Sequence, residues 1–94
     1  AGLWEVWQTP DGVALPTCTI ITTGPNSLMA TLHDRMPVIL APEAYDRWLD
    51  PAPQAPTDLT PLLVSYPAEA MALHAVARVV NSPAHDSPAC IEPA

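Results

Sequence analysis

The chain is organised around residues 17–40, which read TCTIITTGPNSLMATLHDRMPVIL. The first seven of these residues are rich in β-branched side chains, which favour a strand over residues 17–23. A glycine and a proline end that strand, and Asn26 follows them as a residue type that commonly caps a helix. We therefore expect a strand, a short helix through residue 32, and then a connection that carries a histidine, an aspartate and an arginine.

His33, Asp34 and Arg35 place a titratable imidazole beside a carboxylate and one of only three basic side chains in the chain. Histidine changes charge near physiological pH, so it can serve as an acid or a base. Functional residues concentrate in connections between ordered elements. Against this, a lone histidine is more often a hydrogen-bonded structural residue. From the residues alone, both interpretations of His33 stay open.

The remaining pattern predicts an α+β chain with a mixed, mainly antiparallel sheet and short helices. Aromatic and β-branched residues predict a strand over residues 3–7, and Pro-Asp-Gly at residues 10–12 predicts a turn. That turn would pair the strand with residues 17–23. A proline forces the residue before it into an extended conformation, so Met36 should lead into a short buried strand over residues 38–40.

Further along the chain, 13 prolines against 3 glycines favour short elements and stiff connections. Aromatic side chains at Trp4, Trp7 and Trp48 are expected in the core, with Cys18 as a buried, unreactive free thiol. We expect a helix that begins at residues 41–43 and ends at Asp50, then a Pro-rich surface linker over about residues 50–57 and helical turns within residues 57–64. After these we expect a strand over residues 71–80, a polar loop over residues 82–88 and a terminal strand over residues 89–92.

The composition is acidic, with ten Asp and Glu residues against three Lys and Arg and a formal net charge of −7. Proteins that bind nucleic acid normally carry a basic face, so the charge alone argues against that function. We expect neither a leader nor a membrane anchor, because no apolar run approaches the roughly 20 residues of a spanning helix. The expected location is cytoplasmic. An apolar strand at the first residues suggests a fragment of a longer domain.

A metal site is an alternative role for the same residue types. The dipeptide His33-Asp34 recurs as His85-Asp86, and His74 and Cys90 are further ligand types. None of these residues falls at a spacing that places two ligands on one face of a helix. We therefore expect neither a metal nor another cofactor.

Several blocks of the chain share one register with a known family. They are residues 1–5 (AGLWE), 19–23 (TIITT) and 33–40 (HDRMPVIL), together with Asn26, Met29, Trp48, Leu49, His74, Val76 and residues 79–81 (VVN). In these residues the chain resembles the SOS response-associated peptidase (SRAP) family, and residues 33–40 are the most specific part of the match. The resemblance implies a single-stranded DNA protein, cytoplasmic and nucleoid-associated, that forms a covalent crosslink with abasic sites.

The resemblance also implies roles for individual residues. In that family an N-terminal Cys offers its amine and thiol to the aldehyde of the abasic sugar and closes a thiazolidine. A Glu and an Asn from the upstream half assist, together with the histidine that matches His33. His33 would be catalytic, by opening the sugar ring or stabilising its departing oxygen. Arg35 would lie near the DNA phosphates, and Thr22 would add a neutral phosphate contact.

The sequence departs from the family pattern at its first residue, which is Ala1 rather than Cys. Cys18 and Cys90 have their nitrogens in peptide bonds and cannot close a thiazolidine, and Glu5 is not the family's catalytic Glu. We therefore expect residues 1–94 to be the C-terminal portion of a single SRAP-like domain, inactive alone. An upstream half would complete the site and supply most of the basic surface. The competing hypothesis is a non-catalytic structural or interaction domain, a decayed family member.

Overall fold

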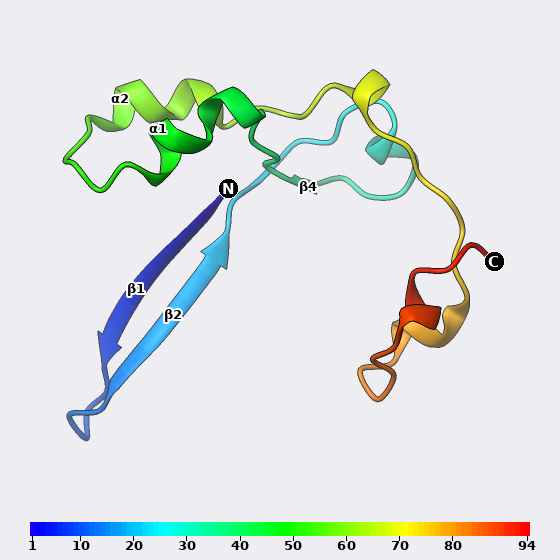
Figure 1. Cartoon of the computed structure of the whole chain (residues 1–94), viewed down its shortest axis with the longest axis horizontal. Coiled ribbons are helices and arrows are strands. Elements are labelled where there is room, and N and C mark those ends of the chain that lie inside the picture. Colours follow the sequence, from blue (N-terminus) through cyan, green and yellow to red (C-terminus); the bar gives the residue numbers. More distant parts are fainter.

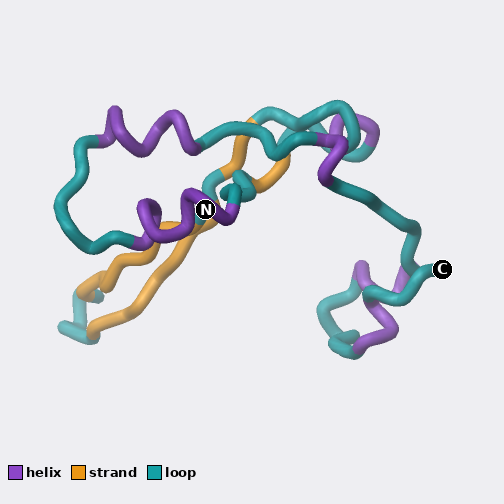
Figure 2. Tube along the Cα trace, turned by 45° about the horizontal axis from the view of Figure 1, so that its top comes forward, coloured by secondary structure: helices purple, strands orange, loops and turns teal.

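The computed structural model describes all 94 residues as short elements along an open path, most of it loop (Figures 1 and 2). Short antiparallel sheets and short helices make it an α+β chain, as predicted. No helix is long and apolar enough to cross a membrane. The elements are β1 (Gly2–Gln8), β2 (Ala14–Ile20), β3 (Thr22–Thr23), η1 (Met29–Thr31), β4 (Met36–Pro37), η2 (Pro42–Ala44), α1 (Tyr45–Leu49), α2 (Pro56–Leu59), η3 (Thr60–Leu62), η4 (Ala68–Ala70), η5 (Arg78–Asn81) and η6 (Pro88–Cys90).

β1 and β2 form an antiparallel hairpin, as predicted, with a register that runs from Gly2 opposite Ile20 to Gln8 opposite Ala14. The single strand predicted over residues 17–23 is divided, because β2 ends at Ile20 and Thr22–Thr23 form β3 in the second sheet. The turn forms where the sequence predicts it. Gly12 has a φ of 81°, in the left-handed region that only glycine adopts without strain. Its N–H donates to the carbonyl of Thr9 over 2.9 Å, which closes the turn.

The hairpin is joined to the second sheet by three backbone hydrogen bonds that meet at one point. The amide of Ile21 donates to the carbonyl of Ala1, and the amide of Val38 donates to the carbonyl of Ile21, both over 2.9 Å. The nitrogen of Ala1 in turn donates to the carbonyl of Val38 over 2.6 Å. Three segments far apart in the sequence are therefore fixed side by side, and we call this arrangement the backbone junction.

Next to the backbone junction, β3 pairs antiparallel with β4, with Thr22 opposite Pro37 and Thr23 opposite Met36. Met36, Val38 and Leu40 are the buried side chains, at 1%, 1% and 9% exposure. Their spacing of two is that of a strand with one covered face. The predicted burial is confirmed for Val38 and Leu40, whereas Ile39 between them is 40% exposed. The paired strand itself lies earlier than predicted, at Met36–Pro37.

The predicted helices are present but are shorter than expected. The Oδ1 of Asn26 accepts the N–H of Met29 over 2.9 Å, so Asn26 caps a single turn, η1. Pro42 occupies the first turn of η2, which continues into α1. The side-chain amide of Gln54 donates to the carbonyl of Arg47 over 2.9 Å and bonds one of the unpaired carbonyls at the end of α1. α2 and η3 occupy the region predicted to contain helical turns.

The predictions of a strand over residues 71–80 and of a terminal strand over residues 89–92 are wrong. The first region makes one isolated bridge, Val76 with Pro93, and then turns into η5. The second region begins inside η6. Extended backbone needs a neighbouring strand to satisfy its amides and carbonyls. In this chain only a short pairing is available, in which Ala94 donates to Ala75 over 2.8 Å.

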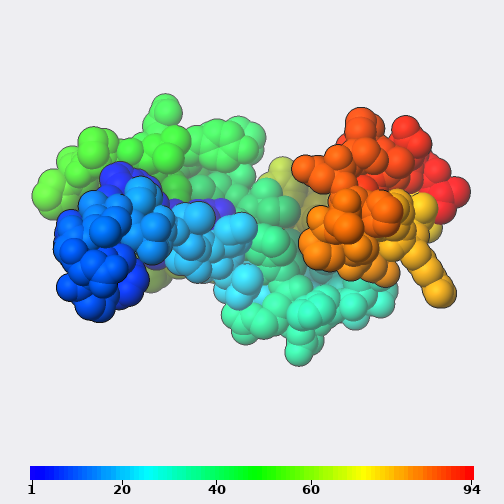
Figure 3. Space-filling model, turned by 90° about the horizontal axis from the view of Figure 1, so that it is seen from below, coloured from blue at the N-terminus to red at the C-terminus, as the bar shows by residue number.

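Most apolar side chains of the chain remain exposed. Only 3 of 94 residues are buried, and the radius of gyration is 17.2 Å, against roughly 12 Å for a compact domain of this length. Figure 3 shows the hairpin and residues 74–94, which we call the C-terminal lobe, at opposite ends of the molecule. The chain has no common core for these parts to share.

The core positions predicted for two tryptophans and for Cys18 are therefore wrong in this chain. Trp4 is 77% exposed and Trp7 is 53% exposed, and Cys18 is an exposed free thiol. The physical reason is that these residues lie on a two-stranded ribbon, and the chain covers only the start of it, with Trp48. Trp48 is half-buried, and its indole N–H donates to the carbonyl of Gly2 over 3.2 Å.

Residues 1–94, expressed alone, should unfold without a cooperative transition, because a chain with so small a buried core gains too little free energy to offset its conformational entropy. Urea titration followed by circular dichroism and by tryptophan fluorescence checks this. We expect broad, non-coincident curves and a fluorescence maximum typical of solvated indole. A single steep transition shared by both probes would contradict the prediction.

Candidate functional site

The register of β3 and β4 brings Thr22 and Arg35 together. Thr22 lies opposite Pro37, so the residue two positions before Pro37 is its diagonal neighbour on the same face, within reach of a long side chain. The guanidinium of Arg35 donates to Thr22 Oγ1 from Nε over 3.0 Å and from Nη2 over 2.7 Å. Nη2 also lies 3.4 Å from the Thr22 carbonyl. The arginine is thus held against the edge of the sheet while its Nη1 donors stay free.

His33 follows η1 directly, and its position is fixed by its backbone. Its N–H donates to the carbonyl of Met29 over 2.9 Å, which continues the turn that Asn26 begins. The imidazole Nδ1 lies 3.0 Å from the backbone nitrogen of Arg35 and 3.0 Å from Oδ1 of Asp34. Its Nε2 makes no hydrogen bond to another protein atom, and the side chain is 67% exposed. This nitrogen is therefore free to meet a ligand.

The turn that carries His33 is anchored by hydrogen bonds to residues 65–71. The side-chain amide of Asn26 donates to the carbonyl of Tyr66 over 2.7 Å and lies 3.2 Å from the sulfur of Met71. Ser65 Oγ donates to the carbonyl of Gly24 over 2.8 Å. These bracing residues were not predicted from the sequence. The available signal was Asn26 itself, since an asparagine that caps a helix with its oxygen still has an amide to satisfy.

Thr22, His33 and Arg35, the three predicted site residues, therefore lie together on one exposed edge, with Asp34 beside them. The group offers a fixed cation, a hydroxyl whose proton is free to donate, and an imidazole. Such a set suits binding an anionic oxygen and moving a proton near it. The cavities of the chain lie elsewhere. One of about 450 Å³ opens between residues 39–44 and 61–67, and one of about 560 Å³ between β1 and the end of α1.

The cysteines and the other histidines are not brought to this edge. Cys18 lies opposite Trp4 on the hairpin, and Cys90 Sγ lies 3.7 Å from the carbonyl of His85 in the C-terminal lobe. His74 Nε2 lies 3.0 Å from the carbonyl of Ile91. No group of three or more His, Cys, Asp or Glu side chains converges anywhere in the chain. The residues considered as metal ligands are therefore distributed over two separate regions.

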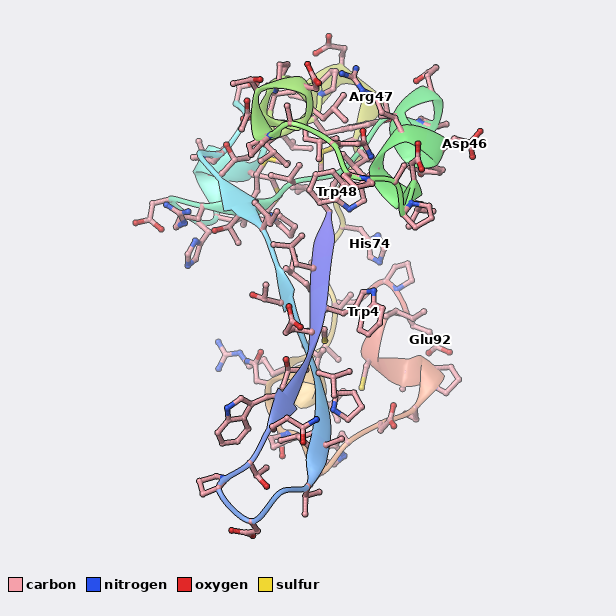
Figure 4. The ribbon with its side chains drawn as sticks, turned by 90° about the vertical axis from the view of Figure 1, so that its left-hand side faces the viewer. Trp4, Asp46, Arg47, Trp48, His74 and Glu92 are labelled. Carbon is pink, nitrogen blue, oxygen red and sulfur yellow. The ribbon has the colours of Figure 1, made fainter.

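A tryptophan pair marks the second region of interest. Figure 4 shows Trp4 projecting from β1 and Trp48 lying over the start of the hairpin. Both line the cavity of about 560 Å³, together with Leu3 and Leu49. Because Leu49 is 75% exposed and lies in this cavity, the cavity is an uncovered apolar groove.

Comparisons with known proteins find one family and its members over most of the chain. The family model "SOS response associated peptidase (SRAP)" matches residues 1–83. Among curated relatives, abasic site processing protein YoqW of Bacillus subtilis (strain 168) is 52% identical over 92 residues, which are 98% of this chain and 41% of the relative. Abasic site processing protein HMCES of Gallus gallus is 41% identical over 95 residues, covering 99% of this chain and 28% of the relative.

A solved structure has the same fold over this segment. The crystal structure of a protein from Bacteroides thetaiotaomicron superposes with a TM-score of 0.83 at 28% sequence identity, and the match covers 99% of this chain and 41% of that chain. The chain thus spans about two-fifths of the length of the bacterial proteins that it matches.

Proposed function

Because the chain belongs to the SOS response associated peptidase (SRAP) family, we propose that it is part of an abasic-site sensor that crosslinks covalently to single-stranded DNA. The names of its relatives support the abasic-site role, since both the bacterial and the vertebrate proteins are abasic site processing proteins. The observation that carries the proposal is the cluster of Thr22, His33 and Arg35 on one exposed edge.

In the proposed reaction, His33 Nε2 meets the deoxyribose at the abasic site. The closed sugar is unreactive toward amines until its ring opens to the aldehyde. In that step the bond between C1′ and the ring oxygen breaks, the ring oxygen takes up a proton, and the hydroxyl on C1′ loses its proton to water and becomes the aldehyde carbonyl. An imidazolium at His33 supplies that proton as a general acid. The position suits this role because the ring is anchored through its backbone and through Nδ1, while Nε2 stays free.

The covalent step needs a nucleophile that residues 1–94 do not carry. One residue must offer both an amine and a thiol, which condense with the aldehyde to a thiazolidine and release one water. We propose that an N-terminal Cys of an upstream half provides both groups. That half would also supply the assisting Glu and Asn, the peptidase-like chemistry that the family name suggests, and any lyase-like chemistry.

The exposed hairpin supports the proposal that this chain is the C-terminal portion of one domain. Leu3, Trp4 and Ile20 are 54%, 77% and 66% exposed, and both edges of the two-stranded ribbon are free. Additional strands would cover these apolar side chains and satisfy the backbone at the edges. A segment of the same polypeptide is the simplest occupant, because the YoqW relative is more than twice the length of this chain.

Arg35 and Thr22 are proposed to hold a phosphate of the DNA strand. The hydroxyl of Thr22 accepts from the guanidinium and fixes it, and the remaining Arg35 donors can then approach phosphate oxygens. The net charge of −7 is compatible with this, provided that the upstream half carries the rest of the basic surface. We also propose a cytoplasmic, nucleoid-associated location, because the DNA substrate lies there.

A test of the catalytic role is His33→Ala in the protein at its complete natural length. Loss of the general acid should slow crosslinking to abasic single-stranded DNA by about 100-fold. The rate is read from the shifted band on a denaturing gel. His85→Ala, which removes a histidine of the C-terminal lobe that also precedes an aspartate, is the matched control and should react at the normal rate. Equal rates in both variants would remove His33 from the mechanism.

A test of the phosphate contact is Arg35→Ala, measured as affinity for an intact single strand at several salt concentrations. Removing one phosphate contact should reduce the slope of log affinity against log salt by about 0.7. Thr22→Val keeps the charge and loses the anchor, so affinity should fall with little change in slope. Arg78→Ala, on η5, is the control. A slope that is unaffected by Arg35→Ala would contradict the contact.

Residues 1–94 alone should form no covalent adduct with abasic DNA, since neither cysteine has a free amine. Incubation with the DNA followed by a denaturing gel checks this. An adduct would contradict the requirement for an upstream nucleophile. If the complete protein also forms no adduct, the competing hypothesis of a non-catalytic interaction domain is favoured instead.

A further inference from the structure

Nδ1 of His33 has two partners in the structure and can satisfy only one of them at a time. The backbone N–H of Arg35 lies 3.0 Å away and requires a lone pair on Nδ1. The Oδ1 of Asp34 also lies 3.0 Å away and requires a proton on Nδ1. Because a ring nitrogen carries either a lone pair or a proton, Nδ1 cannot accept from the Arg35 amide and donate to Asp34 at the same time.

We propose that Asp34 is a positioning residue that decides which nitrogen of His33 carries the proton. When Nδ1 donates to Asp34, a neutral ring has its lone pair on Nε2, which is then a base. When Nδ1 accepts from Arg35, the neutral ring carries its proton on Nε2, which is then a hydrogen-bond donor. In the charged ring Nδ1–H is held by Asp34, and Nε2–H is the acid that the proposed function requires.

The same exchange couples the proton on His33 to Arg35. Whenever Nδ1 is protonated, the amide of Arg35 loses its acceptor and its backbone is released from the imidazole. The guanidinium of that residue is meanwhile held by Thr22. The acid-base residue and the phosphate-binding residue therefore respond to one proton. This inference rests on the proposed function for its consequences, although not for its geometry.

The surroundings of His33 leave Asp34 as the group that controls this choice. η1 (Met29–Thr31), which precedes the histidine, contains no ionisable residue, and β3 contributes only threonines. The ionisable neighbours are Asp34, which favours a proton on Nδ1, and Arg35, whose amide opposes it. Asp34 is 89% exposed, so its effect is that of a solvated pair and amounts to a few-fold change in populations.

Sequence adjacency alone does not produce this arrangement. His85 and Asp86 repeat the dipeptide, yet the only contact between a histidine ring nitrogen and a carboxylate oxygen in the structure is the one between His33 and Asp34. The N–H of His85 donates to Ser82 over 3.1 Å, and its carbonyl lies near Cys90, in a loop with no following strand. The second dipeptide is therefore a matched control for the first.

The test is Asp34→Asn in the complete protein, followed by nitrogen NMR of the His33 ring and by amide exchange at Arg35. Removal of the charge should lower the share of neutral ring that is protonated at Nδ1 by about two- to fivefold. Exchange at the Arg35 amide should slow, because its acceptor is then available more of the time. Asp34→Glu keeps the charge and should stay nearer the wild type, and Asp86→Asn should change neither signal. An unaltered tautomer ratio in Asp34→Asn would overturn the inference.

The crosslinking rate of the same variants, measured across pH, separates this inference from the proposed function. A shifted tautomer ratio with a changed pH profile supports the role of Asp34 in the reaction. A shifted ratio with an unchanged profile removes Asp34 from the reaction. If the wild-type protein forms no crosslink, the proposed function fails, and the nitrogen signals still decide whether Asp34 controls the ring.

Discussion

The backbone junction of Ala1, Ile21 and Val38 is the constraint on which the rest of the structure depends. Three hydrogen bonds there tie the start of the hairpin to β3 and β4. Burial of Met36, Val38 and Leu40 stabilises the same point from one side. Because β4 is held in this way, Arg35 at its entrance meets Thr22 across the sheet. The candidate site is thus a consequence of strand register.

The position of His33 depends on a second set of contacts, those of Asn26. Its side-chain oxygen caps η1, and its side-chain amide contacts Tyr66 and Met71. One side chain therefore both caps the turn and anchors it to residues 65–71. The turn ends at His33, with the ring held through Nδ1 and Nε2 free. The candidate site thus combines a backbone fixed by hydrogen bonds with exposed side chains.

The largely uncovered hairpin accounts for the small buried core of the chain. β1 and β2 pair with each other along their whole length, yet most of the surface of their large apolar side chains is exposed to solvent. In the relatives this segment is about two-fifths of the protein or less. Polypeptide that covers the hairpin would complete the core and, in the function proposed here, would bring the reacting cysteine to His33.

The sequence by itself determined the local elements and the family: the hairpin with Gly12 in its turn, the cap at Asn26, the burial of Val38 and Leu40, and the SRAP signature around His33. The local elements follow from conformational propensities that act within a few residues. Only the tertiary structure decided that residues 71–80 do not form a strand and that Trp4, Trp7 and Cys18 lie exposed. It also decided that Arg35 is held by Thr22 and that Asp34 shares Nδ1 with the Arg35 amide. Strand pairing, burial and side-chain contacts require a partner surface, and which surfaces meet is a property of the folded chain.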